Sequence, residues 1–87
     1  MTNGAEVMVM TTEYIQAAMR HAQYEQLPDG TFYAEIPGFM SNDVWSTGAT
    51  QEACWDALAR ALQVKVDLML TKGRGLFLPV FDGVQAQ

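Results

Sequence analysis

The 87-residue sequence contains one histidine, one cysteine and only five lysine or arginine residues. The lone cysteine, Cys54, excludes a disulfide within the chain and a metal site built from several thiolates. The lone histidine, His21, excludes a histidine-based metal cluster. The longest apolar run is far shorter than the roughly 20 residues that a membrane span needs. The first residues lack the basic start and apolar core of a secretory signal, so we expect a cytoplasmic protein that does not bind membranes.

Basic residues are missing altogether between Arg20 and Arg60. The same segment contains the acidic residues Glu25, Asp29, Glu35, Asp43, Glu52 and Asp56. Nucleic-acid binding usually requires clustered lysine and arginine, which neutralise phosphates, so we expect no direct nucleic-acid partner. A basic protein partner fits better, because complementary charges speed encounter and select partners. An ordinary solubilising surface would explain the same acidic residues.

The first predicted element is a short amphipathic helix at residues 12–22. Apolar residues recur at helical spacing between Tyr14 and Ala22. A threonine just before this run is a good N-cap, because its hydroxyl can accept a bond from a free backbone N–H. Residues 1–11 are therefore predicted to be a flexible leader.

The segment QYEQLPDGTFYAEIPGF, residues 23–39, predicts two strands joined by a tight turn. Pro28 suits the fixed φ at the start of a type I turn, and Gly30 suits the left-handed position that closes a three-residue loop. The resulting register puts Gln23, Glu25, Tyr33 and Glu35 on one face of the hairpin and Phe32, Ala34 and Ile36 on the other. Because the second face is apolar, we expect it to cover the core and to leave the first face exposed.

A third strand is predicted at residues 44–48, followed by a long helix that Thr50 caps and Gly73 ends. Residues 76–79 read as a final edge strand, where a proline is tolerated. Apolar residues cover more of the long helix than one small sheet can bury. We therefore predict a homo-oligomer, a dimer or larger, that associates through Ala57, Val64 and Leu68.

Together these elements predict a two-layer α+β fold. An antiparallel sheet of three to four strands packs against one long helix, and an extra helix precedes the sheet. Residues 12–81 are expected to form this single domain, and residues 82–87 a C-terminal tail.

No combination of residues predicts catalysis. His21 has no matching nucleophile. A helix N-terminus can activate a thiol, but Cys54 lies on the apolar side of the long helix, which favours core packing. Glu52 and Asp56 are one helical turn apart, yet a hard cation normally takes more oxygen ligands than two carboxylates supply. We expect no catalytic residue, no metal site and no cofactor.

Several short motifs follow one another in a recognisable order. They are Tyr24 in the first strand, Asp29-Gly30, the strand from Phe32 to Ile36, Pro37-Gly38, Thr47-Gly48-Ala49-Thr50, Glu52-Ala53, Gly73 and Leu78-Pro79. This ordered set, over residues 22–80, resembles the HicB-like antitoxin family of type II toxin–antitoxin systems.

The resemblance implies a partial RNase-H-like sheet of β-β-β-α-β order, without the catalytic carboxylates of true RNase H. It also implies a non-enzymatic bacterial protein that self-associates. Such a protein neutralises a small, basic, mRNA-cleaving HicA-type toxin by covering the active-site histidine of the toxin. Many family members carry a C-terminal DNA-binding domain; only a few residues follow Pro79 here, so we expect none.

Acidic and aromatic residues of the predicted sheet region are the candidate partner-binding residues: Glu25, Asp29, Tyr33, Glu35, Asp43 and Trp45. Two alternatives belong to other function classes. A vestigial RNase-H-like, metal-dependent nuclease would use Asp43, Glu52 or Asp56. A small-molecule sensor would bind its ligand in a pocket lined by Trp45 and Trp55.

Overall fold

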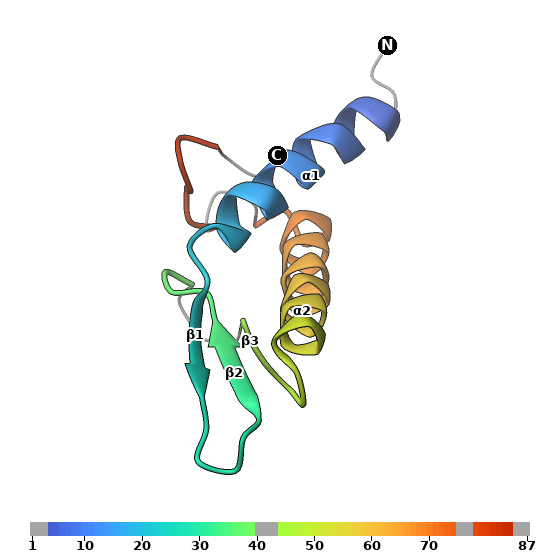
Figure 1. The fold of residues 1–87 in the computed structure, drawn as a ribbon. Helices are drawn as coiled ribbons and strands as arrows, with labels where there is room; N and C mark the ends of the chain where they lie inside the picture. Colours follow the sequence, from blue (N-terminus) through green and yellow to red (C-terminus); the bar gives the residue numbers. More distant parts are fainter. Residues whose placement is uncertain (1–3, 40–43, 75–77, 85–87) are drawn as a thin grey trace.

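The chain folds into a small sheet with two helices, in a computed structural model that describes residues 4–39, 44–74 and 78–84. In chain order the elements are α1 (Gly4–Met19), β1 (Gln23–Gln26), β2 (Phe32–Glu35), β3 (Trp45–Gly48) and α2 (Gln51–Thr71) (Figure 1). The strands form one antiparallel sheet in the order β1-β2-β3. The predicted α+β class is confirmed, with three strands in the described part of the chain.

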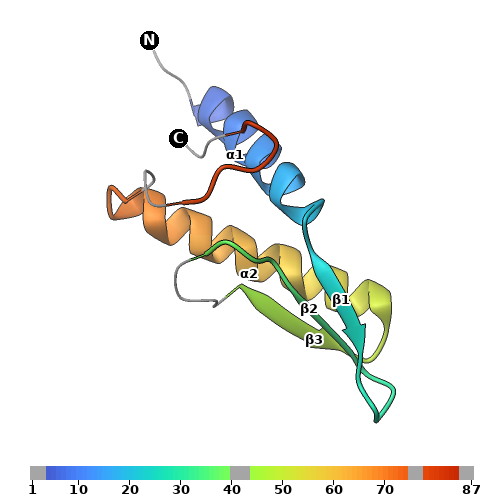
Figure 2. The ribbon, with the colours of Figure 1, turned by 90° about the vertical axis from the view of Figure 1, so that its left-hand side faces the viewer.

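The elements stack in layers, with α2 lying along one face of the sheet and α1 packed at an angle against α2 (Figure 2). Residues 78–84 run back along α1 toward its C-terminal end, as the same view shows. Neither helix of the described residues is long and apolar enough to cross a membrane.

The hairpin between β1 and β2 has the predicted register, with Glu25 opposite Tyr33 and Gln23 opposite Glu35. At the turn, the backbone N–H of Leu27 donates to the Thr31 carbonyl at 2.8 Å. Gly30 has a φ of 90°, a left-handed conformation that favours glycine over residues with a Cβ atom. The turn chemistry therefore fixes which side chains share each face of the sheet.

The joint between β3 and α2 is very tight at Gly48. A Cβ atom at this position would lie 2.5 Å from the backbone nitrogen of Cys54, so only glycine fits. The buried Ser46 hydroxyl donates to the Cys54 carbonyl at 2.8 Å, which ties the same two elements together. Thr50 caps α2 as predicted, because its side chain accepts from the Ala53 N–H at 3.0 Å.

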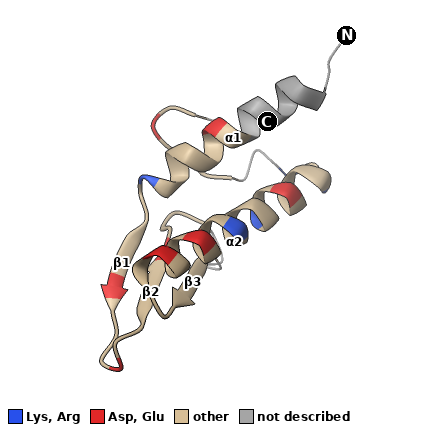
Figure 3. Ribbon diagram, turned by 45° about the vertical axis from the view of Figure 1, so that its right-hand side comes forward, with Lys and Arg blue, Asp and Glu red and all other residues tan. Residues whose placement is uncertain are grey.

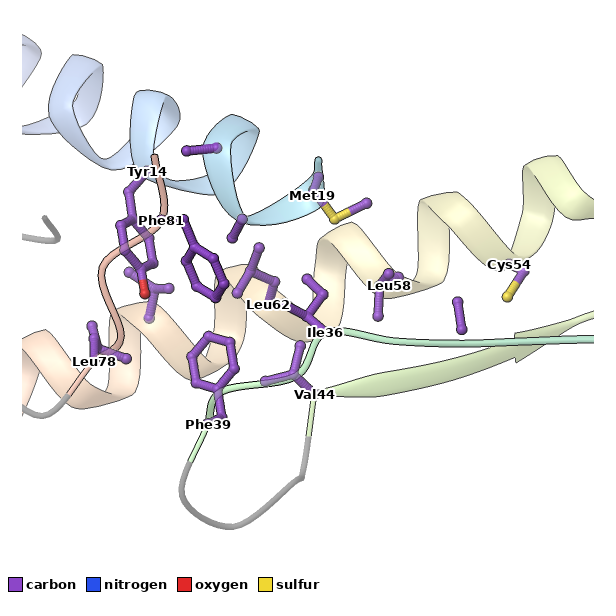
Figure 4. Packing of buried hydrophobic residues seen from close by; sticks show 14 residues of the cluster. Tyr14, Met19, Ile36, Phe39, Val44, Cys54, Leu58, Leu62, Leu78 and Phe81 are labelled. Carbon is purple, nitrogen blue, oxygen red and sulfur yellow. The ribbon is translucent and has the colours of Figure 1, made fainter. Parts of the chain in front are cut away.

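The core lies between the sheet, the two helices and the C-terminal segment (Figure 4). Its fully buried side chains of largest volume are Tyr14, Ile36, Val44, Cys54, Leu58, Leu62 and Val66. The Tyr14 hydroxyl donates to the Pro79 carbonyl at 2.6 Å, and the Tyr14 ring packs against Phe81. Burial of Tyr14 raises its pKa to about 12. This tyrosine therefore holds the C-terminal segment against α1.

The prediction of a helix at residues 12–22 is wrong at both ends. The helix starts at Gly4, inside the segment expected to be a flexible leader, and ends at Met19. Alanine, glutamate and methionine have high helix propensity, and they make up much of residues 4–10, so the helix does not have to start at a threonine cap. At the other end, the His21 N–H bonds to the Ala18 carbonyl at 2.9 Å, which tightens the last turn before β1.

The predicted final strand at residues 76–79 is not present in its described part. Residues 76 and 77 lie outside the described residues, and Leu78 and Pro79 form no strand. Leu78 is buried in the core instead, and proline has no N–H to donate to a sheet. The pairing that the structure describes in this segment is an isolated bridge between Phe81 and Val84.

Candidate protein-binding surface

The face of the sheet turned away from α2 carries most of the predicted partner-binding residues. We call it the outer sheet face; by the strand register it consists of Gln23, Glu25, Tyr33, Glu35, Trp45 and Thr47. Alternate residues point to the opposite face, where Ala34 and Ser46 are buried under α2. The prediction that Tyr33 and Glu35 point away from the core agrees with this register.

Two aromatic side chains form the centre of the outer sheet face. The rings of Tyr33 on β2 and Trp45 on β3 stack, with centroids 6.1 Å apart and an interplanar angle of 26°. Trp45 remains 51% exposed although it is one of the largest apolar side chains of the protein. In the described part of the chain β3 is an edge strand, so the pair lies beside the open edge of the sheet that these residues form.

Two carboxylates flank this aromatic pair. Glu25 lies directly opposite Tyr33 across β1 and β2, and Glu35 lies directly opposite Trp45 across β2 and β3. Partial burial raises the pKa of the Tyr33 hydroxyl, and the negative charges of Glu35 and Glu25 raise it further. The tyrosine therefore stays neutral, and the charge of the outer sheet face is negative.

Asp29 lies at the tip of the hairpin, beyond the outer sheet face. Its carboxylate accepts bonds from the Thr31 hydroxyl at 2.6 Å and the Thr31 N–H at 3.0 Å. These hydrogen bonds lower the pKa of Asp29. The residue therefore has a structural role in the turn, although its side chain is exposed. The candidate Asp43 lies outside the described residues.

Acidic positions on the hairpin and basic positions on α2 lie in different parts of the molecule (Figure 3). On α2, Val64 is 65% exposed and Leu68 is 47% exposed, while Ala57 is half-buried. A shallow groove of about 410 Å³ lies on the same side of the helix, lined by Arg60, Ala61, Val64, Lys65 and Leu68. The sequence prediction did not include Arg60 and Lys65, although their spacing of one helical turn from Val64 and Ala61 signals the shared face.

The residues weighed for catalysis are spread over the molecule. Cys54 is fully buried, and its sulfur lies 3.5 Å from the Ser46 hydroxyl. His21 lies at the surface, with Nε2 2.8 Å from the Asp82 carboxylate. Glu52 and Asp56 are exposed on α2. Among the residues that the structure describes, no three histidine, cysteine, aspartate or glutamate side chains gather as a metal site would require.

The two tryptophans do not line one pocket. Trp45 belongs to the outer sheet face, whereas Trp55 on α2 stacks on Tyr24 at 5.9 Å. Tyr24 is directly opposite Ala34, so it lies on the inner face of the sheet. The structure therefore separates the two residues that the sensor alternative requires to be together.

Sequence reasoning missed an ion-pair cluster that holds the C-terminal segment. One carboxylate oxygen of Asp82 accepts a hydrogen bond from Nε of Arg20 at 3.0 Å. The other oxygen lies 2.8 Å from Nε2 of His21. Asp82 has a φ of 52°, in the left-handed region. The partners are 61 and 62 positions apart in the chain, so no local pattern could have indicated this contact.

A family model described as UPF0150-like matches residues 13–76, which is most of the chain and includes all three strands and α2. The chain belongs to the UPF0150-like family. This family is HicB-related and antitoxin-like, and proteins of that kind are typically non-enzymatic and bind a protein partner. No curated protein matches the chain.

The fold of this UPF0150-like protein is similar to a solved structure, the crystal structure of TTHA0281 from Thermus thermophilus. The TM-score is 0.78 at 30% sequence identity, and the similarity covers 90% of this chain and 93% of that chain. This similarity covers a larger share of the chain than the family model does.

Proposed function

We propose that this UPF0150-like protein is an antitoxin that neutralises a small, basic, mRNA-cleaving toxin of the HicA type. The outer sheet face binds the toxin and covers its active site. The observation that carries the proposal is the exposed Tyr33–Trp45 stack flanked by the carboxylates of Glu25 and Glu35. The antitoxin-like character of the family supports it.

The aromatic pair and the carboxylates together suit a cationic side chain of the partner. An arginine guanidinium placed over the exposed Trp45 ring would gain about 0.5–2 kcal/mol from the cation–π interaction. Glu35, opposite Trp45 in the ladder, can then accept hydrogen bonds from the same guanidinium. Tryptophan, tyrosine and arginine are also the residues most enriched in interface hot spots.

The charge of the surface matches the task of an antitoxin. A toxin that binds mRNA presents positive charge where the phosphates of the RNA lie. An acidic, aromatic protein surface competes for that site, because it offers negative charge and flat rings in place of phosphates and bases. No basic residue lies between Arg20 and Arg60, so the strands carry no positive charge that would repel a basic toxin.

The test uses a candidate toxin, namely a basic, histidine-bearing protein encoded by a short reading frame adjacent to this one. The full-length protein is expected to bind it and to inhibit its cleavage of RNA. The double variant Glu25→Lys/Glu35→Lys should weaken binding on the order of 100-fold, mainly through the association rate. Raising the salt concentration should weaken binding of the unmodified protein much more than binding of this variant.

The matched control is Glu13→Lys/Asp56→Lys, which changes the net charge equally at exposed helical positions. Its affinity for the toxin should stay within a fewfold of the unmodified protein. Equal losses in the two double variants would show that only net charge matters and would contradict a site on the sheet. Absence of binding and of inhibition by the unmodified protein would reject the toxin as the partner.

A further inference from the structure

A shallow groove of about 410 Å³ lies on one flank of α2 and is lined by Arg60, Ala61, Val64, Lys65 and Leu68; we call it the α2 groove. Its apolar residues lie roughly 100° around the helix from the buried residues that face the core. Val64 and Leu68 are among the most exposed large apolar residues that the structure describes. Apolar side chains gathered on an exposed flank are typical of a contact surface.

Two cations border the apolar floor of the α2 groove, one on each edge. At 100° per residue, Arg60 and Lys65 lie about 140° apart, and Ala61, Val64 and Leu68 fall between them. Arg60 is exposed, and within the described ranges its guanidinium has no carboxylate within salt-bridge distance. Lys65 is half-buried, on the edge nearer the core. The groove is therefore an apolar strip between two positive charges.

The surroundings of the α2 groove are positive although the protein as a whole is negative. Four of the five basic residues of the chain, Arg60, Lys65, Lys72 and Arg74, lie between the middle of α2 and the residues just after it, with Asp67 as the one acidic residue among them. Four positive charges and one negative charge give residues 60–74 a charge of +3, in a chain whose net charge is −5. This segment therefore attracts acidic partners, whereas the outer sheet face attracts basic ones (Figure 3).

We propose that the α2 groove binds an acidic amphipathic helix of another protein. Apolar side chains of that helix pack on Val64 and Leu68, and carboxylates on either side of them pair with Arg60 and Lys65. The groove follows α2 over residues 60–68, about two helical turns, which matches the i, i+3, i+4 and i+7 anchors of a helix bound in a groove. The small Ala61 side chain lets the axes of the two helices approach closely.

The charge of the α2 groove favours this occupant over three others. A second copy of this chain, the association predicted from sequence through Ala57, Val64 and Leu68, would bring a second segment of charge +3 to the same place. A basic toxin would be repelled in the same way. A nucleic acid would match the positive charge, but its binding draws on more cations than the two that line the groove, and it would leave the apolar floor without an apolar partner.

This interaction goes beyond the proposed function and does not rest on it. The outer sheet face lies on the strands and has two carboxylates, whereas the α2 groove lies on the helix and has two cations. The protein therefore has two surfaces of opposite charge, so that a basic toxin and an acidic partner bind at different places.

Binding of two matched peptides to the purified full-length protein tests the proposal in the absence of any toxin. Both are fluorescently labelled, alanine-based helices of about 18 residues with leucines at the i, i+3, i+4 and i+7 positions. One peptide has glutamates on both flanks of the leucines, and the other has lysines there. Fluorescence anisotropy should show that the acidic peptide binds at least about tenfold more tightly than the basic one. Raising the salt concentration should narrow this difference.

Charge reversal in the α2 groove should reverse the preference. The double variant Arg60→Glu/Lys65→Glu is expected to bind the basic peptide more tightly than the acidic one. Leu68→Ser should weaken binding of the acidic peptide by about tenfold, because it removes apolar contact area. The matched control is Lys72→Glu/Arg74→Glu, an equal charge change just after α2, which should keep the preference within a fewfold. Circular dichroism checks the folding of every variant.

Equal affinities for the two peptides, or no binding of either, would overturn the proposal. So would a control variant that loses the preference as completely as Arg60→Glu/Lys65→Glu. Displacement of the acidic peptide by a uridine oligonucleotide would make the groove an RNA site. A dimer of the unmodified protein that Leu68→Ser dissociates in sedimentation analysis would make it a self-association site. Either result rejects an acidic helix as the occupant, and because no toxin is present, none of these outcomes bears on the proposed function.

Discussion

The two exposed faces of the molecule differ in how their side chains are held and in the kind of contact that they offer. The outer sheet face combines stacked rings with two carboxylates at fixed ladder positions. The exposed side of α2 carries Val64 and Leu68, with Arg60 and Lys65 beside them. The first therefore suits a partner of opposite charge, whereas the second offers mainly apolar contact area. Amphipathic patterning alone would have marked only the second as a binding surface.

The contact between Gly48 and Cys54 connects the layers that carry these faces, and breaking it should have the largest effect. Gly48→Ala places a Cβ atom about where the backbone of α2 runs, so β3 and α2 must separate. We expect a loss of about 3 kcal/mol in the free energy of unfolding, measured by urea denaturation. Toxin binding should then decline as well.

Thr47→Ala is the matched control for Gly48→Ala, because Thr47 is the neighbouring residue on the outer sheet face and is exposed. This variant should unfold within about 1 kcal/mol of the unmodified protein. A Gly48→Ala variant as stable as Thr47→Ala would contradict the tight joint.

The two tryptophans separate binding from stability. Trp45→Ala should reduce toxin affinity by about 2 kcal/mol, because it removes the exposed ring of the aromatic pair. Trp55→Ala removes the ring that stacks on Tyr24 at the inner face, so it should lower stability and leave toxin affinity within a fewfold. Calorimetric titration and thermal unfolding of both variants provide the measurements. The reverse pattern would place the toxin on the α2 side of the molecule.

The smallest predicted effect concerns the ion-pair cluster at Asp82, remote from both faces. Hydrogen bonds from His21 and Arg20 lower the pKa of Asp82. A lowered pKa in the folded state stabilises the fold above the ordinary value of about 3.9, and this contribution is lost as the pH falls through the lowered pKa. Asp82→Asn should therefore be slightly less stable at pH 7 and equally stable near pH 2.

Thermal unfolding across this pH range checks the Asp82 prediction. Toxin binding should not respond to the substitution, because Asp82 contacts Arg20 and His21 just after α1 rather than the outer sheet face. If Asp82→Asn and the unmodified protein differ in stability by the same amount at every pH, ionisation of Asp82 is not the cause of that difference.

Local patterns predicted the hairpin and α2 well, because short-range chemistry controls both. The Pro28, Asp29 and Gly30 turn sets the strand register, and the period of two then assigns every side chain to a face. Thr50 similarly marks the start of α2, and Gly73, with a φ of 69°, marks its end. The candidate residues Glu25, Tyr33, Glu35 and Trp45 were therefore found on one face as a consequence of register.

Patterns were less informative at both ends of the chain. The start of α1 was misplaced because Thr11 and Thr12 were taken as its N-cap, although Asn3 directly before Gly4 is also a residue type that caps helices. Leu78 looked like part of a strand, but its burial depends on Tyr14 and Phe81, which are distant from each other in the chain. The groove residues Arg60 and Lys65 became candidates only once the exposed side of α2 was known.

The sequence by itself determined the hairpin register, the N-cap of α2 and the acidic character of the sheet region, since these depend on neighbouring residues and on a simple count of charges. Tertiary structure decided which apolar residues of α2 remained exposed, that Trp45 stacks on Tyr33, and that Asp82 joins Arg20 and His21. These outcomes depend on contacts between residues far apart in the chain, and the energy of such contacts is set by packing, which no local window of sequence contains.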